Sequence, residues 1–121
     1  MQDGSSSASA CLFCRIASRT LPADIVGEAE GLVAFKDINP QAPVHLLIVP
    51  TVHIPTLADL TATHTPLIGH VTHFANRLAQ QHGLLPAGYR LVVNCGSQAG
   101  QSVWHVHWHL LGGRPLRWPP G

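Results

Sequence analysis

The sequence predicts a small α+β domain, in which an antiparallel sheet of about five strands carries one long and one short helix on one face. Short apolar runs are separated by turn residues, as in strands, and one long segment has helical spacing. The expected strands are joined mostly by short turns, which favours antiparallel pairing. The length of 121 residues fits one domain.

The first half of the chain predicts the short helix and three strands. Residues 11–18, CLFCRIAS, can form a short helical turn that ends before Pro22. Residues 24–40 predict a hairpin, because strand formers flank a turn at Glu30-Gly31. Residues 44–50, VHLLIVP, form a short apolar run that is typical of a buried strand.

The second half predicts the long helix and two further strands. Thr63 or Thr65 can cap this helix, Pro66 suits its first turn, and Gly83 ends it. We expect strands at residues 89–94 and 103–111, and an extended tail at residues 114–121. The helix has apolar residues at helical spacing, Leu67, Ile68, Val71, Phe74, Ala75, Leu78 and Ala79, and surface histidines are expected at His64, His70, His73 and His82.

Composition limits the classes of partner. Charged residues make up 11% of the chain, the net charge is +1 and no Lys/Arg cluster occurs, so we expect no nucleic-acid partner. No apolar run approaches the roughly 18 residues of a membrane helix, so we expect no membrane partner. Residues 1–10, MQDGSSSASA, do not resemble a secretory signal and predict a disordered tail before a domain at residues 11–121.

Three cysteines, two of them in the pair Cys11-x-x-Cys14, suit a reducing compartment, and we expect a cytoplasmic protein. The pair indicates free thiols or a metal site rather than a disulfide framework. Alone it is a weak zinc signal, because a structural zinc site needs two more ligands. Cys95 is expected to be a small loop residue.

Histidines at alternate positions mark the segment SVWHVHWHLLGG, residues 102–113. On a strand His105, His107 and His109 share one face, while the apolar residues between them face the core. A solvent-facing polar stripe would not require histidine. One chemical interpretation is a metal site, since His-x-His on a strand commonly holds zinc or iron. The other is nucleophilic attack by a neutral imidazole on a phosphoryl or acyl centre.

The preceding segment NCGSQAGQS, residues 94–102, favours nucleophilic catalysis. Glycine lets backbone N–H groups approach a ligand closely. Together with a serine hydroxyl and an asparagine amide, such groups can bind a phosphate without a cationic side chain. By itself the segment could be an ordinary hairpin loop, but it leads directly into the histidines.

With these motifs the chain resembles the histidine-triad (HIT) nucleotide-binding family, which is marked by His-x-His-x-His followed by apolar residues. HVHWHLLGG fits that mark as written. LFCRI, LPADIV, AFKDINPQAPVHLLIVP, GYRLVVNCGS and the ending WPPG are similar to the Hint branch of the family. The resemblance covers roughly residues 11–121, and a third histidine in place of the glutamine of other branches also points to Hint.

The resemblance implies a homodimer whose sheets join edge to edge. It also implies a purine nucleoside phosphoramidase that hydrolyses the P–N bond of adenosine (or guanosine) 5'-monophosphoramidates through a covalent nucleotidyl-histidine. In that reaction His107 would be the nucleophile, supported by His109 and His105, and Ser102 and Asn94 would contact the phosphate. The other implied nucleotide-binding residues are Gly100, Gln101 and Trp118, with Asp37 on the ribose and Phe35 and Ile38 along the purine. From the residues alone, Asp37 can be a turn acid, and Phe35 and Ile38 can be core.

For the cysteine pair, the resemblance implies His53 and His105 as the missing ligands of a closed, structural zinc site that the chemistry itself does not require. The alternative is two ordinary thiols. Two other functions stay open at this point. One is a metal-dependent phosphohydrolase that uses the triad as ligands, and the other is a non-catalytic nucleotide-binding regulatory module.

Overall fold

The computed structural model describes residues 10–121. The tail predicted at residues 1–10 therefore lies, except for Ala10, outside the described residues. Within residues 10–121, no helix combines the length and the apolar character that crossing a membrane would require.

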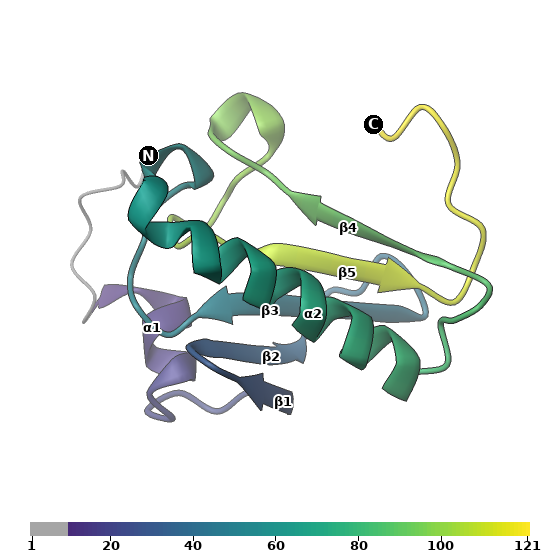
Figure 1. The fold of residues 1–121 in the computed structure, drawn as a ribbon, viewed down its shortest axis with the longest axis horizontal. Helices are drawn as coiled ribbons and strands as arrows, with labels where there is room; N and C mark the ends of the chain where they lie inside the picture. Colours follow the sequence, from purple (N-terminus) through teal and green to yellow (C-terminus); the bar gives the residue numbers. More distant parts are fainter. Residues whose placement is uncertain (1–9) are drawn as a thin grey trace.

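One antiparallel sheet of five strands forms the centre of the molecule (Figure 1). Its strands are β1 (Ile25–Ala29), β2 (Leu32–Lys36), β3 (Val44–Pro50), β4 (Tyr89–Val93) and β5 (Trp108–Gly112), in the order β1-β2-β3-β5-β4. The predicted sheet is confirmed, and so is the hairpin turn at Glu30-Gly31, where Ala29 pairs with Leu32. Gly31 has a φ of +71°, a conformation that favours glycine.

Two α-helices accompany the sheet, the short α1 (Leu12–Ala17) and the long α2 (Thr65–Gln81). Single 3-10 turns lie at Leu57–Asp59, Ala62–His64 and Ser97–Ala99. The predicted cap of the long helix is wrong. His64 occupies the cap position of α2 without a capping hydrogen bond, because its Nδ1 accepts the Thr61 N–H of the preceding 3-10 turn. Pro66 lies in the first turn of α2, as predicted.

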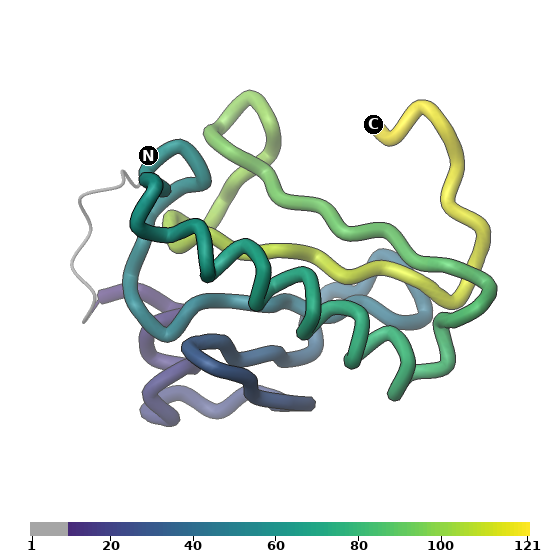
Figure 2. Tube along the Cα trace, viewed as in Figure 1, coloured from purple at the N-terminus to yellow at the C-terminus, as the bar shows by residue number. Residues whose placement is uncertain are grey.

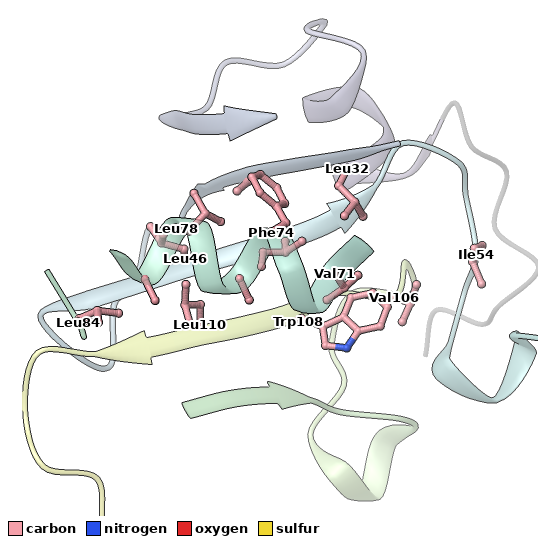
Figure 3. Packing of buried hydrophobic residues seen from close by; sticks show 14 residues of the cluster. Leu32, Leu46, Ile54, Val71, Phe74, Leu78, Leu84, Val106, Trp108 and Leu110 are labelled. Carbon is pink, nitrogen blue, oxygen red and sulfur yellow. The ribbon is translucent and has the colours of Figure 1, made fainter. Parts of the chain in front are cut away.

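The two helices cover opposite faces of the sheet, so the prediction that both lie on one face is wrong. Because side chains alternate along a strand, β2 and β3 each have two buried faces. Figure 3 shows α2 packed on one face, with Phe74 and Leu78 against Leu46. On the other face, α1 contributes Cys11, Phe13 and Ile16 to a second cluster with Val33, Phe35, Leu47 and Val49. Uninterrupted apolar runs in β2 and β3 are the sequence signal for a sheet covered on both faces.

The last strand is shorter than predicted, since β5 begins at Trp108 and not at residue 103. His105 and His107 therefore precede the strand. The chain departs from the ladder because the Val106 N–H donates to the carbonyl of Ile54, at 2.7 Å. The alternation still persists, and Val106, Trp108 and Leu110 all pack in the α2 core.

After β5 the chain forms no further helix or strand, as predicted for the tail (Figure 2). The prediction that all four histidines near α2 are surface residues is only partly right. His73 is exposed, whereas His64, His70 and His82 are half-buried. The Nδ1 atom of His82 lies 2.9 Å from the carbonyl of Leu78 at the end of the helix.

Candidate active site and metal cluster

A cavity of about 600 Å³ opens on the α1 face of the sheet. Its wall includes His107, His109, Asp37 and Ser102, together with Asp24 and Lys36, and the rest of the wall is apolar. The structure thus brings the last two triad histidines together with the predicted ribose acid and phosphate serine. The apolar wall comes from Leu12, Phe13, Ile16, Leu21, Pro22, Phe35, Ile38, Leu47 and Val103.

Within residues 10–121, His107 is held with one ring nitrogen free. Its Nδ1 lies 2.8 Å from the carbonyl oxygen of His105. A carbonyl can only accept, so Nδ1 carries the proton and Nε2 keeps its lone pair. Burial lowers the pKa of His107, opposed by the His105 carbonyl and by Asp37, so the ring is neutral. A neutral imidazole with a free Nε2 at a cavity wall has the form of a nucleophile.

His109 is oriented by His45, a residue that the sequence analysis did not select. The backbone N–H of Gln41 donates to Nδ1 of His45, at 3.0 Å, so the proton of His45 is on Nε2. That Nε2 lies 2.9 Å from Nδ1 of His109. Nδ1 of His109 is therefore the acceptor, and its Nε2 carries an N–H. The only signal in the sequence was a polar residue inside the buried run VHLLIVP.

Burial also keeps these two rings neutral. It lowers the pKa of His109 to about 4, with further contributions from His107 and His45. It lowers the pKa of His45, opposed by the carboxylate of Asp37. Nε2 of His45 lies 3.4 Å from Oδ2 of Asp37, and Oδ1 of that carboxylate accepts the Asn39 N–H at 2.8 Å. Asp37 therefore combines the predicted turn role with a place in the cavity wall.

Phe35 and Ile38 differ in environment although both line the cavity. Phe35 is 3% exposed and belongs to the α1 cluster, so it is a core residue that also lines the cavity, and its contact with a purine stays a prediction. Ile38 is fully exposed at the rim. The contribution of α1 was not predicted from the sequence, although its Leu12, Phe13 and Ile16 line the cavity.

The loop before the triad is built on glycines and on one glutamine. Gly96 and Gly100 have φ values of +90° and +94°. Oε1 of Gln101 accepts the Gly96 N–H at 2.8 Å, and its amide group donates to the carbonyls of Pro55 and Val103. The backbone N–H groups of Gly100 and Gln101 donate to carbonyls inside the loop. The side chain of Gln101 thus fixes the loop, and Ser102 is its residue in the cavity wall.

Four further residues were predicted from the resemblance to contact a nucleotide. Asn94, Gly100 and Gln101 do not belong to the cavity wall, and neither does Trp118, which is 82% exposed. Their roles toward a nucleotide stay predictions.

The predicted metal ligands Cys11, Cys14, His53 and His105 form one cluster, with their ligand atoms all within 4.8 Å of one another. Nδ1 of His105 lies 3.4 Å from Sγ of both cysteines, and Nδ1 of His53 lies 3.3 Å from Sγ of Cys14. Tetrahedral zinc with Zn–S of about 2.3 Å and Zn–N of about 2.05 Å separates sulfur from nitrogen by about 3.5 Å. The observed spacings fit such an ion.

The protonation states of the cluster also suit a metal. Nε2 of His105 lies 2.8 Å from the Pro50 carbonyl, so its proton is there and Nδ1 offers a lone pair to the cysteines. Burial lowers the pKa of His105 to about 4, which keeps it neutral. Burial, with a contribution from Cys11, raises the pKa of Cys14 to about 12. A bound cation would reverse that preference, because metal-ligating thiols are deprotonated.

The three triad histidines do not converge on one point. His105 faces the cysteines, whereas His107 and His109 face the cavity. A second group of metal-type ligands among the described residues is Asp37, His45 and His109. There the Nε2–H of His45 donates to the lone pair of His109 Nδ1, so this lone pair is not open to a metal ion. The two rings instead form a hydrogen-bonded relay.

The chain is similar to known proteins over most of its length. The HIT domain model matches residues 18–116. The purine nucleoside phosphoramidase of Escherichia coli is 46% identical over 87% of this chain and 88% of its own length. A 14 kDa zinc-binding protein of Zea mays is 45% identical over 91% of this chain and 87% of its own length.

A solved structure extends the likeness to three dimensions. The HIT family hydrolase of Legionella pneumophila superposes with a TM-score of 0.90 at 50% identity, over 92% of this chain and 99% of its own. The chain belongs to the HIT domain family.

Proposed function

We propose that this chain is a purine nucleoside phosphoramidase, which hydrolyses the P–N bond of adenosine or guanosine 5'-monophosphoramidates through a nucleotidyl-histidine. The observation that carries the proposal is the 2.8 Å contact between His107 Nδ1 and the His105 carbonyl. It leaves Nε2 of His107 free in a cavity that also holds a second histidine. The name of the Escherichia coli relative supports the substrate class.

In the first step, Nε2 of His107 attacks phosphorus, a new P–N bond to the histidine forms and the P–N bond to the amine breaks. The ring of His107 then carries a positive charge, which the His105 carbonyl stabilises through Nδ1–H. The departing amine takes a proton from Nε2 of His109. An anionic phosphate beside His109 favours its protonated form, in which Nδ1 also carries a proton and the Nε2–H of His45 donates instead to Oδ2 of Asp37, 3.4 Å away.

In the second step, water attacks the phosphorus, the bond to His107 breaks and a nucleoside monophosphate is released. His109 has given up its Nε2 proton and keeps the one on Nδ1, so its Nε2 now accepts a proton from the water. Splitting one difficult displacement into two easier ones is the purpose of the covalent intermediate. We place Ser102 at the phosphate, together with Asn94, Gly100 and Gln101 of the loop, and His105 as support for His107.

The mostly apolar wall suits the nucleoside. A planar purine can lie against the cavity wall that Phe35 and the side chains of α1 form, and the exposed Ile38 would cover its outer edge. Asp37 offers a carboxylate oxygen to the ribose hydroxyls, a favourable charge-assisted contact. The chemistry of these walls accepts adenine and guanine alike.

We further propose a structural zinc ion on Cys11, Cys14, His53 and His105. The spacing of the four ligand atoms supports it, and so does the zinc-binding name of the Zea mays relative. A closed set of four ligands leaves no position for substrate, so the ion would tie α1 to the sheet and take no part in the reaction. Free thiols at these positions also suit a cytoplasmic protein.

A homodimer completes the proposal. Strand β4 is an edge of the sheet and pairs only with β5 within the described chain. All five of its residues are half-buried, and an unpaired edge can add a strand from a second copy. We therefore expect two sheets joined along β4.

The remaining candidates are less well supported. A metal-dependent phosphohydrolase would need the triad on one ion, but His105 faces a different cluster from His107 and His109. A binding module without turnover would not require the free Nε2 of His107.

The test uses adenosine 5'-monophosphoramidate with wild-type protein and with His107→Ala. Wild type should release AMP and, after an acid quench, carry an AMP adduct by mass spectrometry. His107→Ala should lose both and still bind AMP, while His73→Ala on the exposed side of α2 should match wild type. Turnover by His107→Ala within about tenfold of wild type would contradict the assignment, because covalent catalysis would then contribute little.

A further inference from the structure

One ring of α1 lies directly against the candidate nucleophile. The centroids of Phe13 and His107 are 5.0 Å apart, and their planes meet at 84°. Both side chains are buried, at 4% and 6% exposure. Edge-to-face pairs at this separation are attractive, in addition to filling space.

The orientation of His107 depends on such contacts. Among the described residues its ring makes one hydrogen bond, from Nδ1 to the His105 carbonyl. The torsion that turns an imidazole about its Cβ–Cγ bond has broad minima, so one hydrogen bond leaves the ring room to swing. The rings of Phe13 and His109, each with its centroid 5.0 Å from that of His107, restrict this motion.

Phe13 is itself fixed from two directions. It lies between Cys11 and Cys14, where Sγ of Cys11 accepts the Cys14 N–H at the start of α1. Its ring also packs edge-to-face on Phe35, with centroids 5.4 Å apart. The ring that touches His107 therefore belongs to a rigid part of the fold.

We propose that Phe13 is a positioning residue for His107, whose ring holds the imidazole in the orientation that directs Nε2 into the cavity. The proposal rests on the proposed function, in which His107 is the nucleophile. An attacking atom displaced by about 1 Å can cost on the order of 100-fold in rate. The effect of Phe13 should therefore fall on the rate of attack rather than on nucleotide affinity.

The test compares Phe13→Leu with Ile16→Ala. Each substitution removes the same number of side-chain carbon atoms from α1 and from the same cavity wall, but Ile16 has no ring to set against His107. At saturating phosphoramidate, Phe13→Leu should slow formation of the AMP adduct by about tenfold or more, with the Kd for AMP within about threefold of wild type. Ile16→Ala should instead weaken AMP binding by more than about threefold, while formation of the AMP adduct at saturation should slow by less than about tenfold. Phe13→Met, whose unbranched and flexible side chain adapts better to the space, replaces Phe13→Leu if that variant is unfolded.

A second readout needs no turnover. Side-chain ¹⁵N spectra of the ligand-free protein should show a single Nδ1–H tautomer for His107 in wild type and in Ile16→Ala, and a mixture in the Phe13 variants. If wild type forms no adduct, the proposed function fails while the spectra still decide the role of Phe13. A Phe13 variant that keeps the single tautomer and the wild-type rate of adduct formation, or that loses only AMP affinity, overturns the proposal.

Discussion

The Nε2 atom of His45 lies 2.9 Å from Nδ1 of His109, and this contact decides which nitrogen of His109 faces the substrate. The backbone N–H of Gln41 can only donate, and by donating to Nδ1 of His45 it fixes the positions of the protons on both rings. From there each ring accepts on Nδ1 and carries its proton on Nε2. The relay therefore presents an N–H to the cavity, where the leaving amine needs a proton.

Replacing His45 should impair catalysis through His109. His45→Leu removes the donor to Nδ1 of His109 and allows the wrong tautomer, so kcat should fall roughly 100-fold, at the low end of general acid–base contributions. His45→Gln keeps an N–H donor near the same position and should retain most of the rate. The measurement is steady-state hydrolysis of adenosine 5'-monophosphoramidate. Equal rates for the two variants would show that the relay does not set the tautomer of His109.

The cysteine pair should determine zinc content. Cys11→Ser combined with Cys14→Ser should reduce zinc from about one ion per chain to near none, because two of four ligands are lost. The Tm should fall by more than about 5 °C, on the order of 1 kcal/mol for a domain of this size. Cys95→Ser, which removes the exposed thiol outside the cluster, is the control and should keep its zinc. Elemental analysis with equal zinc in both proteins would argue against the site.

Some of this arrangement could be predicted from the sequence because its signals are local. The strand patterns, the long helix and the alternation of the triad depend on neighbouring residues. The role of His45 could not, since it depends on His109, which is 64 positions away. Likewise His105 turns toward Cys11, 94 positions earlier, and the chain there leaves the sheet ladder before β5 begins.

The face of the sheet that α1 covers could not be predicted from local sequence patterns either. Phe13 and Ile16 are apolar, as a core helix requires, but nothing in the segment specifies which face of the sheet it covers. Only the apolar runs of β2 and β3, which need cover on both sides, constrain that choice. The cavity wall that α1 supplies follows from this placement.

Stability should depend on pH through the buried histidines. Burial lowers the pKa of His109 from 6.5 to about 4, so the folded state binds fewer protons than the unfolded state between these values. The free energy of unfolding should therefore decrease as the pH falls from about 6.5 to about 4. Above that range, the contribution of neutral His109 to stability should be complete. The pKa of His45 and that of His107 are lowered as well, which adds to the same trend.

Urea unfolding of zinc-free protein at a series of pH values between 7.5 and 4.5 measures this slope, with the range set by the pKa of His109. His109→Gln should flatten the slope, because it removes one proton-binding group. His73→Gln on the exposed side of α2 serves as the matched control. A slope that is the same in wild type and in His109→Gln would exclude His109 as a source of the pH dependence.

The C-terminal residues should select the leaving group. Arg90 of β4 donates to the carbonyl of Arg117 at 2.8 Å, which ties the tail to the strand where we propose that a second copy pairs. Trp118 follows immediately and is 82% exposed, and we predict that in the proposed dimer its indole contacts the partner's active site. Removing residues 118–121 keeps the Arg117 carbonyl and should leave a folded dimer by light scattering. The ratio of kcat/KM between AMP amides of bulky and small amines should change by roughly tenfold, as expected for one lost pocket contact.

Trp118→Ala should reproduce most of the change, since the indole supplies the contact area. The small-amine substrate acts as the internal control, because it would not reach the indole. Unchanged ratios across the panel in both variants would mean that the tail takes no part in choosing the amine.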